Sequence, residues 1–181
     1  MKILFASDLH GSGYYTEKLI ALFERSGAEK LVLLGDLYYH GPRNPLTEGY
    51  EPKRVAELLN PLSDKLLVIK GNCDSEVDEM ISDFAFTPYA EIMVDGKKIA
   101  LSHGHRYNID NIPLGADVLI YGHIHTGFIR KAGDVLVANC GSVSLPKNGT
   151  KNSALILDGG KFSLVDLDGT VLEEAEINDK E

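Results

Sequence analysis

A repeating order constrains the fold of this 181-residue chain: short apolar runs alternate with helical patterns, and the runs stop abruptly in polar motifs. Residues 3–6, 31–34 and 66–69 are apolar on both faces, as strands buried in a parallel sheet are. Between these runs, apolar residues recur three or four positions apart within 15–23 and 55–59, which predicts two amphipathic helices. Strands that alternate with helices indicate βαβ units and a parallel sheet.

From about residue 89 onward the pattern changes to hairpins. The turn pairs at 95–96, 159–160 and 168–169 are Asp-Gly or Gly-Gly and separate strand-like segments. No repeat, linker or low-complexity segment interrupts the sequence. We therefore expect one α/β domain over residues 1–181, parallel at its start and antiparallel toward its end. Two packed mixed β-sheets with helices outside them are the expected architecture.

The charge balance restricts the partners of such a domain. The chain has 18 Lys and Arg against 27 Asp and Glu, a formal net charge of −9. This balance argues against long nucleic acids and membrane surfaces, which bind clustered Lys and Arg. Residues 166–181 hold seven acids and one base, so −6 of this charge lies at the end of the chain. The rest of the chain is close to neutral and stays compatible with a small anionic substrate.

Cysteine usage and hydropathy predict the compartment. Cys73 and Cys140 are too few for a disulfide framework, which favours a reducing environment. Asp8 comes too early for the apolar core of a secretory signal, which needs about 7 to 15 residues. No uncharged apolar run approaches the roughly 18 residues that indicate a membrane span. We therefore expect a cytoplasmic protein without a membrane partner.

The polar motifs that end the apolar runs share a few residue types. They are Asp8-Leu9-His10-Gly11, Gly35-Asp36, Gly71-Asn72-Cys73-Asp74, Ser102-His103-Gly104-His105, Gly122-His123-Ile124-His125 and Asn139-Cys140-Gly141-Ser142. In open α/β sheets, ligands bind outside the carboxyl ends of the strands. The six motifs are therefore expected to converge on one crevice.

The converging side chains predict a metal centre. They are two Asp, one Asn and four His, without a pair of cysteines at zinc-finger spacing. Carboxylate and amide oxygens mixed with imidazole suit a catalytic Mn, Fe, Zn or Ni ion. A structural zinc site, in contrast, usually has cysteine thiolates as ligands. These seven donors exceed the three or four that one catalytic ion takes from a protein, so two ions about 3.5 to 4 Å apart are expected.

In this order, the motifs between Asp8 and His125 resemble the signature of the calcineurin-like metallophosphoesterases. Three further segments, at 40–44, 71–78 and 141–147, are similar to the small bacterial phosphodiesterases of the YfcE type. The resemblance implies a four-layer α/β sandwich, manganese as the usual activating ion and frequent homo-oligomers. It also implies a small phosphodiester as substrate.

The resemblance assigns roles to the seven side chains. Asp8, His10 and His125 hold one metal; Asn72, His103 and His123 hold the other; and Asp36 bridges them. A hydroxide that bridges the two ions attacks phosphorus in line with the leaving group, because bound divalent ions lower the pKa of water toward about 7. Asn72 and both metals stabilise the charge that develops on the phosphoryl oxygens.

Two positions depart from the family pattern. Many members carry a second acid after the bridging Asp, where this chain has Tyr39. In many members a histidine follows the metal-binding Asn and helps to protonate the leaving group, whereas this position is Cys73. A thiol with a pKa of about 8.5 is a poorer proton donor at neutral pH than an imidazolium. We therefore predict a preference for phosphodiesters with good leaving groups, such as aryl esters.

Four further residues are candidates with open alternatives. Arg43 and Asn44 follow the bridging Asp in a loop and are candidate substrate-binding residues, although Arg43 also fits a solvated loop charge. Asp74 is interpreted either as a residue that orients a ligand or as the cap of a helix over 75–80. His40 is open between a role in the site and that of a hydrogen-bonded neighbour.

Rival functions share the same motifs. Some members of this fold are protein-binding scaffolds with an impaired metal site, but here all seven ligand positions are filled. Buried carboxylates without a metal repel each other, which a scaffold has no need to tolerate. Among enzymes, a phosphomonoesterase and a cyclic-nucleotide phosphodiesterase stay open as alternatives. A nuclease is disfavoured because no stripe rich in Lys and Arg is present.

Overall fold

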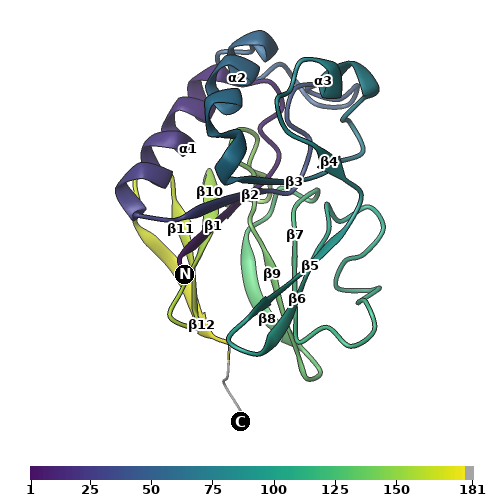
Figure 1. Ribbon diagram of the computed structural model, residues 1–181, viewed down its shortest axis with the longest axis vertical. Coiled ribbons are helices and arrows are strands. Elements are labelled where there is room, and N and C mark those ends of the chain that lie inside the picture. Colours follow the sequence, from purple (N-terminus) through teal and green to yellow (C-terminus); the bar gives the residue numbers. More distant parts are fainter. Residues whose placement is uncertain (178–181) are drawn as a thin grey trace.

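The computed structural model describes residues 1–177, which form two β-sheets packed face to face (Figure 1). The larger sheet has seven strands in the order β12-β11-β10-β1-β2-β3-β4. Its strands are β1 (Ile3–Ala6), β2 (Lys30–Leu33), β3 (Leu66–Ile69), β4 (Phe86–Thr87), β10 (Ser153–Asp158), β11 (Lys161–Asp166) and β12 (Val171–Glu176). The first four strands are parallel, and β10 to β12 continue the sheet antiparallel from β1.

The smaller sheet has five strands in the order β5-β6-β7-β9-β8. They are β5 (Ala90–Val94), β6 (Lys97–Leu101), β7 (Val118–Tyr121), β8 (Phe128–Ala132) and β9 (Val135–Asn139). The central strands β6, β7 and β9 are parallel, with antiparallel strands at both edges. The expectation of antiparallel pairing after residue 89 is therefore wrong for this centre. No helix connects these strands, so the usual signal of a parallel crossover is missing from the sequence.

Two helices, α1 (Gly13–Ser26) and α2 (Pro52–Leu59), pack on the outer face of the seven-stranded sheet (Figure 1). The 3-10 helix η1 (Asn60–Lys65) follows α2, and the short α3 (Glu76–Met80) has no buried residue. The hydroxyl of Ser12 caps the start of α1, and Gly27 follows its end with a φ of 69°. Leu19, Leu22 and Phe23 of α1 pack against Leu4 and other outward-facing strand residues.

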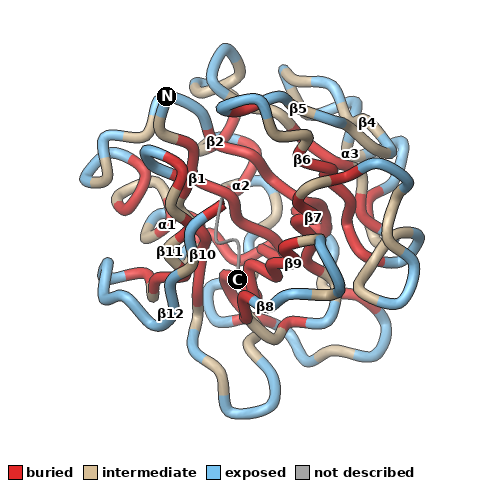
Figure 2. Tube along the Cα trace, turned by 90° about the horizontal axis from the view of Figure 1, so that it is seen from below, coloured by how far each residue is buried: buried red, intermediate tan, exposed pale blue. Residues whose placement is uncertain are grey.

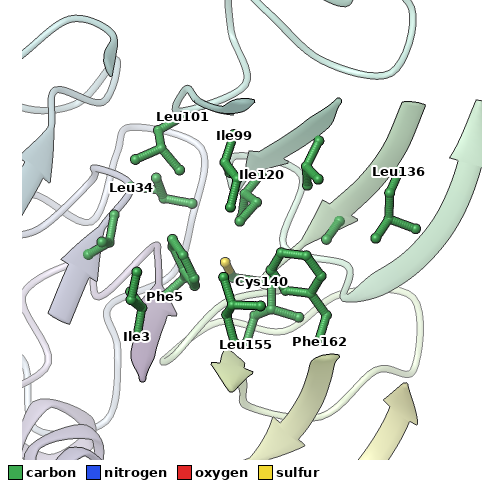
Figure 3. Close-up of a cluster of buried hydrophobic side chains, with 14 of the residues drawn as sticks. Ile3, Phe5, Leu34, Ile99, Leu101, Ile120, Leu136, Cys140, Leu155 and Phe162 are labelled. Carbon is green, nitrogen blue, oxygen red and sulfur yellow. The ribbon is translucent and has the colours of Figure 1, made fainter. Parts of the chain in front are cut away.

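The main core lies between the two sheets (Figure 3). Alternate residues of each strand face it, so Ile3 and Phe5 of β1 meet Ile99 of β6 and Ile120 of β7 there. In the central strands the remaining residues are also buried, which Figure 2 shows as continuous buried segments in β1, β7 and β9. Burial on both faces agrees with the unbroken apolar runs of the sequence.

The outer face of the five-stranded sheet has a different cover. Leu119, Tyr121 and Val137 on this face pack against Ile109 and Ile112 of the segment that joins β6 to β7. The prediction of two packed mixed sheets with helices is confirmed, and the helical layer of the described residues covers one of the sheets. None of the helices within residues 1–177 is long and apolar enough to cross a membrane.

Candidate metal centre

The seven predicted ligands meet at the carboxyl ends of the parallel strands of both sheets. Asp8 and His10 follow β1, Asp36 follows β2, Asn72 follows β3, His103 follows β6, and His123 and His125 follow β7. Backbone hydrogen bonds join neighbouring loops, among them Asp8 N–H to the carbonyl of Gly35 at 3.0 Å between the loops after β1 and β2. The convergence expected from the strand-end motifs is therefore present in the fold.

The backbone is strained at these residues. Asp8, His10, Asp36, His123 and His125 have φ values of 59°, 46°, 56°, 67° and 58°. Such left-handed backbone costs a residue other than glycine about 1 to 2 kcal/mol. Strain of this kind persists only where the surrounding structure imposes it, and it concentrates at functional sites. Its concentration on five predicted ligands therefore marks this crevice as functional.

One cluster consists of Asp8, His10 and His125, all of which are buried. Asp8 Oδ1 lies 3.5 Å from Nε2 of His10 and 3.3 Å from Nε2 of His125, and the two nitrogens are 3.2 Å apart. Within residues 1–177, Asp8 Oδ1 is buried without a hydrogen-bond partner. A buried carboxylate oxygen that faces two imidazole nitrogens fits a divalent cation, which satisfies all three atoms.

A second cluster consists of Asp36, His103 and His123, with Asn72 beside it. His103 Nε2 lies 3.4 Å from Asp36 Oδ2, 3.0 Å from Asn72 Oδ1 and 3.2 Å from His123 Nδ1. Asp36 Oδ2 is also 3.7 Å from His10 Nε2, so this oxygen lies between the two clusters. The arrangement offers two adjacent sets of oxygen and nitrogen donors that share one carboxylate.

Backbone carbonyls fix the rings of three histidines. Nδ1 of His10, His103 and His125 lies 2.8, 2.6 and 2.7 Å from the carbonyl oxygens of Tyr39, Leu34 and Leu145, respectively. A carbonyl only accepts, so each Nδ1 is the donor, and in the neutral ring Nε2 carries the lone pair that a metal needs. His123 is turned the other way and presents Nδ1 to the cluster.

In the absence of a metal, the carboxylates and imidazoles of the two clusters shift the pKa values of one another. Burial opposes the charge of the Asp8 carboxyl, but the imidazoles of His10 and His125 beside it outweigh burial and lower its pKa. Burial favours the neutral imidazole of His103, but the Asp36 carboxylate outweighs burial and raises the pKa of His103 to about 9. His103 is therefore protonated at neutral pH without a metal, and a cation that binds there displaces its proton.

Asp74 holds the loops that carry Asp36 and Asn72. Its carboxylate accepts hydrogen bonds from the backbone N–H groups of Asp36, Leu37 and Gly71 at 2.8, 2.8 and 2.7 Å. The alternative role as a helix cap is wrong, because Ser75 caps α3 in a reciprocal pair with Asp78. Asp74 is thus a positioning residue behind the cluster.

Cys73 lies beside both clusters. Its backbone N–H donates to Asp36 Oδ1 at 2.8 Å, and its sulfur is close enough to His10 and Asp36 to complete a third group of donors. Burial and the nearby carboxylates raise the pKa of the Cys73 thiol to about 12. The thiol therefore stays protonated at neutral pH and is a weak proton donor. Cys140, in contrast, is buried in the core between the sheets.

A cavity of about 800 Å³ opens over the clusters. Its lining includes predicted ligands and their neighbours, namely Asp36, Asn72, Cys73, Asp74, His123 and His125. The loop after β2 also lines the cavity with Arg43 and Asn44. The Asn44 amide donates to the His40 carbonyl at 2.8 Å, which shapes this loop.

The lining residues of the cavity that were not predicted as site residues include Tyr39 and Lys147. Lys147 is exposed, and its backbone N–H donates to the carbonyl of His125 at 2.8 Å. This bond holds a second cation, besides Arg43, near the predicted ligands. Lys147 belongs to the segment 141–147 that is similar to the family, which is the one sequence signal for it. Its positive charge alone does not distinguish it from other surface lysines.

Residues 1–161 match the calcineurin-like phosphoesterase superfamily domain, so the chain belongs to this superfamily of metal-dependent phosphoesterases. Among curated proteins, the Escherichia coli phosphodiesterase YfcE is 43% identical over 98% of this chain and 99% of its own length. The probable metallophosphoesterase YsnB of Bacillus subtilis is 28% identical over 96% of both chains.

Solved structures agree with this membership. The structure of YfcE, described as a phosphoesterase from E. coli, is 42% identical and covers 98% of this chain and 100% of its own, with a TM-score of 0.95. Vps29 of Entamoeba histolytica, solved in complex with zinc, covers 98% of this chain and 100% of its own with a TM-score of 0.67. At 20% identity, the likeness to Vps29 shows a common fold and no more.

Proposed function

We propose that the protein is a metal-dependent phosphodiesterase that hydrolyses small phosphodiesters at this centre. The observation that carries the proposal is Asp8 Oδ1, a buried carboxylate oxygen that lacks a hydrogen-bond partner in residues 1–177 and faces two imidazole nitrogens. The 43% identity to YfcE, named a phosphodiesterase, over nearly the whole chain supports the same activity.

The donor set suits two divalent ions, with manganese as the proposed pair and zinc, iron or nickel as alternatives. Asp8, His10 and His125 would hold one ion, Asn72, His103 and His123 the other, and Asp36 both. When bound, such ions supply a nucleophile at neutral pH and neutralise charge on the phosphoryl oxygens.

Side chains around the cavity would bind the substrate and limit proton transfer to the leaving group. Arg43 and Lys147 place two cations on the rim of the cavity, where they attract a phosphodiester to an otherwise acidic protein. The Asn72 side chain is exposed to the cavity and can donate to a phosphoryl oxygen from its amide. Cys73 is a weak acid at the same place, so it gives little help to an alkoxide leaving group.

The scaffold alternative is not favoured. A protein-binding surface has no need for two buried carboxylates held beside four imidazoles. Burial and the nearby Asp8 oppose the charge of Asp36, and its pKa is lowered because the His103 imidazole outweighs both. Phosphomonoesters and cyclic nucleotides are the alternative substrates for the same centre. Their relative rates against a linear phosphodiester distinguish these activities.

We also propose a compartment and an oligomeric state for the protein, namely the cytoplasm and a homo-oligomer. Cys73 and Cys140 are both free thiols, which suits the reducing conditions of the cytoplasm. Homo-oligomers, which the family resemblance implies, can be detected by sedimentation velocity of the purified chain.

Stripping the metal and restoring it tests the activity. We expect metal-free protein to be inactive on bis(para-nitrophenyl) phosphate and manganese to restore turnover. Asp36→Ala is expected to lower that turnover by at least about a hundredfold. Asp134→Ala, a change at an exposed turn between β8 and β9, serves as the matched control. If manganese restores nothing and Asp36→Ala equals the wild type, the proposed activity is wrong.

A further inference from the structure

A smaller cavity of about 290 Å³ lies next to the metal centre. It shares Tyr39, Cys73 and Ser75 with the main cavity, so the two spaces lie side by side. Its other walls include three apolar or aromatic side chains, from Tyr38, Tyr50 and Val77. A substrate that reaches the clusters can therefore extend a group into this smaller space, which we call the tyrosine pocket.

The structure fixes the walls of the tyrosine pocket. Tyr38 is buried, and its hydroxyl is hydrogen bonded to Ser82 Oγ at 2.6 Å. The ring of Tyr50 lies against Gly11, where an added Cβ would come within 2.5 Å of the Tyr50 ring carbon Cε2. Glycine at this position, with a φ of 75°, therefore makes room for the Tyr50 ring.

Tyr39 connects the pocket to the predicted metal ligands. Its carbonyl accepts the hydrogen bond from His10 Nδ1 at 2.8 Å, while its side chain is 42% exposed at the boundary of the two cavities. The ring of His40 meets the Tyr39 and Tyr50 rings edge-on, with centroids 4.7 and 5.2 Å away. The backbone of Tyr39 thus belongs to the centre, and its ring belongs to the pocket.

The pocket is unsuited to a second phosphate. Its acidic wall residue is Asp78, whose carboxylate already accepts hydrogen bonds from the Ser75 N–H at 2.7 Å and the Ser75 hydroxyl at 2.9 Å. The wall residues include no Lys or Arg. Aromatic faces and an aliphatic side chain, with no cation, favour a flat apolar group.

We propose that the tyrosine pocket binds a planar aromatic ring carried by one ester group of the substrate. This inference rests on the proposed function, since it assigns the phosphate to the metal centre and the ring to Tyr39 and its neighbours. An aryl ester and a nucleobase present the same flat face, and both stack on tyrosine. The pocket then selects phosphodiesters by the ring attached to the phosphate.

Binding measurements test the pocket without turnover. For the manganese-loaded protein, calorimetry is expected to give about tenfold tighter binding of phenylphosphonate than of methylphosphonate. Tyr39→Leu keeps the carbonyl that fixes His10 and is expected to abolish this preference. Tyr14→Leu is the matched control, because Tyr14 is 41% exposed and lines neither cavity. Equal affinities of the wild type for the two phosphonates would overturn the proposal.

A second pair of variants covers the case in which Tyr39→Leu does not fold. Val77→Gln changes an exposed pocket residue of α3, whereas Met80→Gln changes an exposed residue of the same helix outside both cavities. We expect the first to reduce the preference for phenylphosphonate and the second to leave it unchanged. Equal preference in both variants contradicts a ring at Val77.

Two further arms identify the ring and separate the two proposals. Adenosine monophosphate that binds more tightly than ribose phosphate indicates a nucleobase, and a preference limited to phenylphosphonate indicates an aryl group. If the pocket takes the ester group that stays on the phosphate, that group is a ring in bis(para-nitrophenyl) phosphate and a methyl in para-nitrophenyl methyl phosphate, which loses para-nitrophenol. Tyr39→Leu is then expected to raise KM about tenfold for the first substrate alone. Ring-dependent phosphonate binding without turnover of any diester refutes the phosphodiesterase and retains the pocket.

Discussion

The Asp74 carboxylate accepts a hydrogen bond from the backbone N–H of Asp36 at 2.8 Å. Asp36 lies between the two clusters of predicted ligands, and its strained backbone has a φ of 56°. Asp74 also accepts from Leu37 and Gly71, so one buried carboxylate joins the loops after β2 and β3. The position of Asp36 therefore depends on a residue that belongs to neither cluster.

Asp74→Asn is expected to destabilise the fold and weaken metal binding together. The amide keeps one acceptor oxygen, and its NH₂ group meets backbone N–H donors, so at least one buried donor loses its partner. Hydrogen bonds to a charged group contribute about 1.5 to 3 kcal/mol each, so we expect a loss of about 2 kcal/mol in the free energy of unfolding. Urea denaturation and manganese titration measure the two effects. Asp64→Asn, at an exposed position, is the control, and unchanged manganese affinity in Asp74→Asn contradicts the positioning role.

Metal removal should lower stability through the same residues. A ligand that binds only the folded state at a concentration of 100 times its Kd stabilises that state by about 2.7 kcal/mol. We therefore expect chelation to lower the Tm of the protein and manganese to restore it. Asp36→Ala should lose most of this gain, because both clusters use the Asp36 carboxylate. A Tm that does not respond to manganese in the wild-type protein contradicts the metal centre.

The pH should move metal affinity and metal-free stability in opposite directions. The pKa of His103 is about 9 without metal, above its ordinary 6.5, so the folded state holds this proton more tightly than the unfolded state. The metal-free protein therefore gains stability below about pH 6.5 and loses it as the pH rises through about 9. Manganese binding needs the neutral ring, so its affinity should rise over the same range. Calorimetry in buffers of different ionisation enthalpy counts the protons released. An affinity that stays constant from about pH 6 to about pH 8 contradicts this competition.

Much of the centre could be predicted because its ligands follow apolar runs directly. Asp8 and His123 are each two residues beyond a strand that is buried on both faces, and the parallel arrangement brings such positions together. The periodicity of apolar residues indicates which positions are buried and does not identify hydrogen-bond partners. The three hydrogen bonds that Asp74 accepts could therefore not be derived from the sequence. Strand β8 is equally hard to predict, because Arg130 and Lys131 interrupt its apolar pattern.

The walls of both cavities were harder to predict than the ligands. Arg43 and Lys147 lie in loops far apart in the sequence, and only the fold brings them to one rim. In the sequence, Tyr39 differs from the family pattern only as a position without the second acid. Its place beside the centre depends on the hydrogen bond that its carbonyl accepts from His10. Loop residues of this kind have no periodic signal, because their neighbours come from other parts of the chain.

Cys73→His should widen the range of leaving groups. The Cys73 thiol, with a pKa raised to about 12, is a poor proton donor beside the cluster, whereas an imidazolium there can protonate an alkoxide. A positioned acid typically contributes about 10² to 10⁴ in rate, and aryl leaving groups need it least. We therefore expect the rate on an alkyl aryl diester that loses its alkyl group, or on a dialkyl diester, to rise at least about tenfold relative to the bis-aryl rate. Cys73→Ser is the matched control, since a hydroxyl is also a weak acid and should leave this ratio unchanged. If both variants change the ratio equally, the size of the side chain at position 73, and not its acidity, determines the preference.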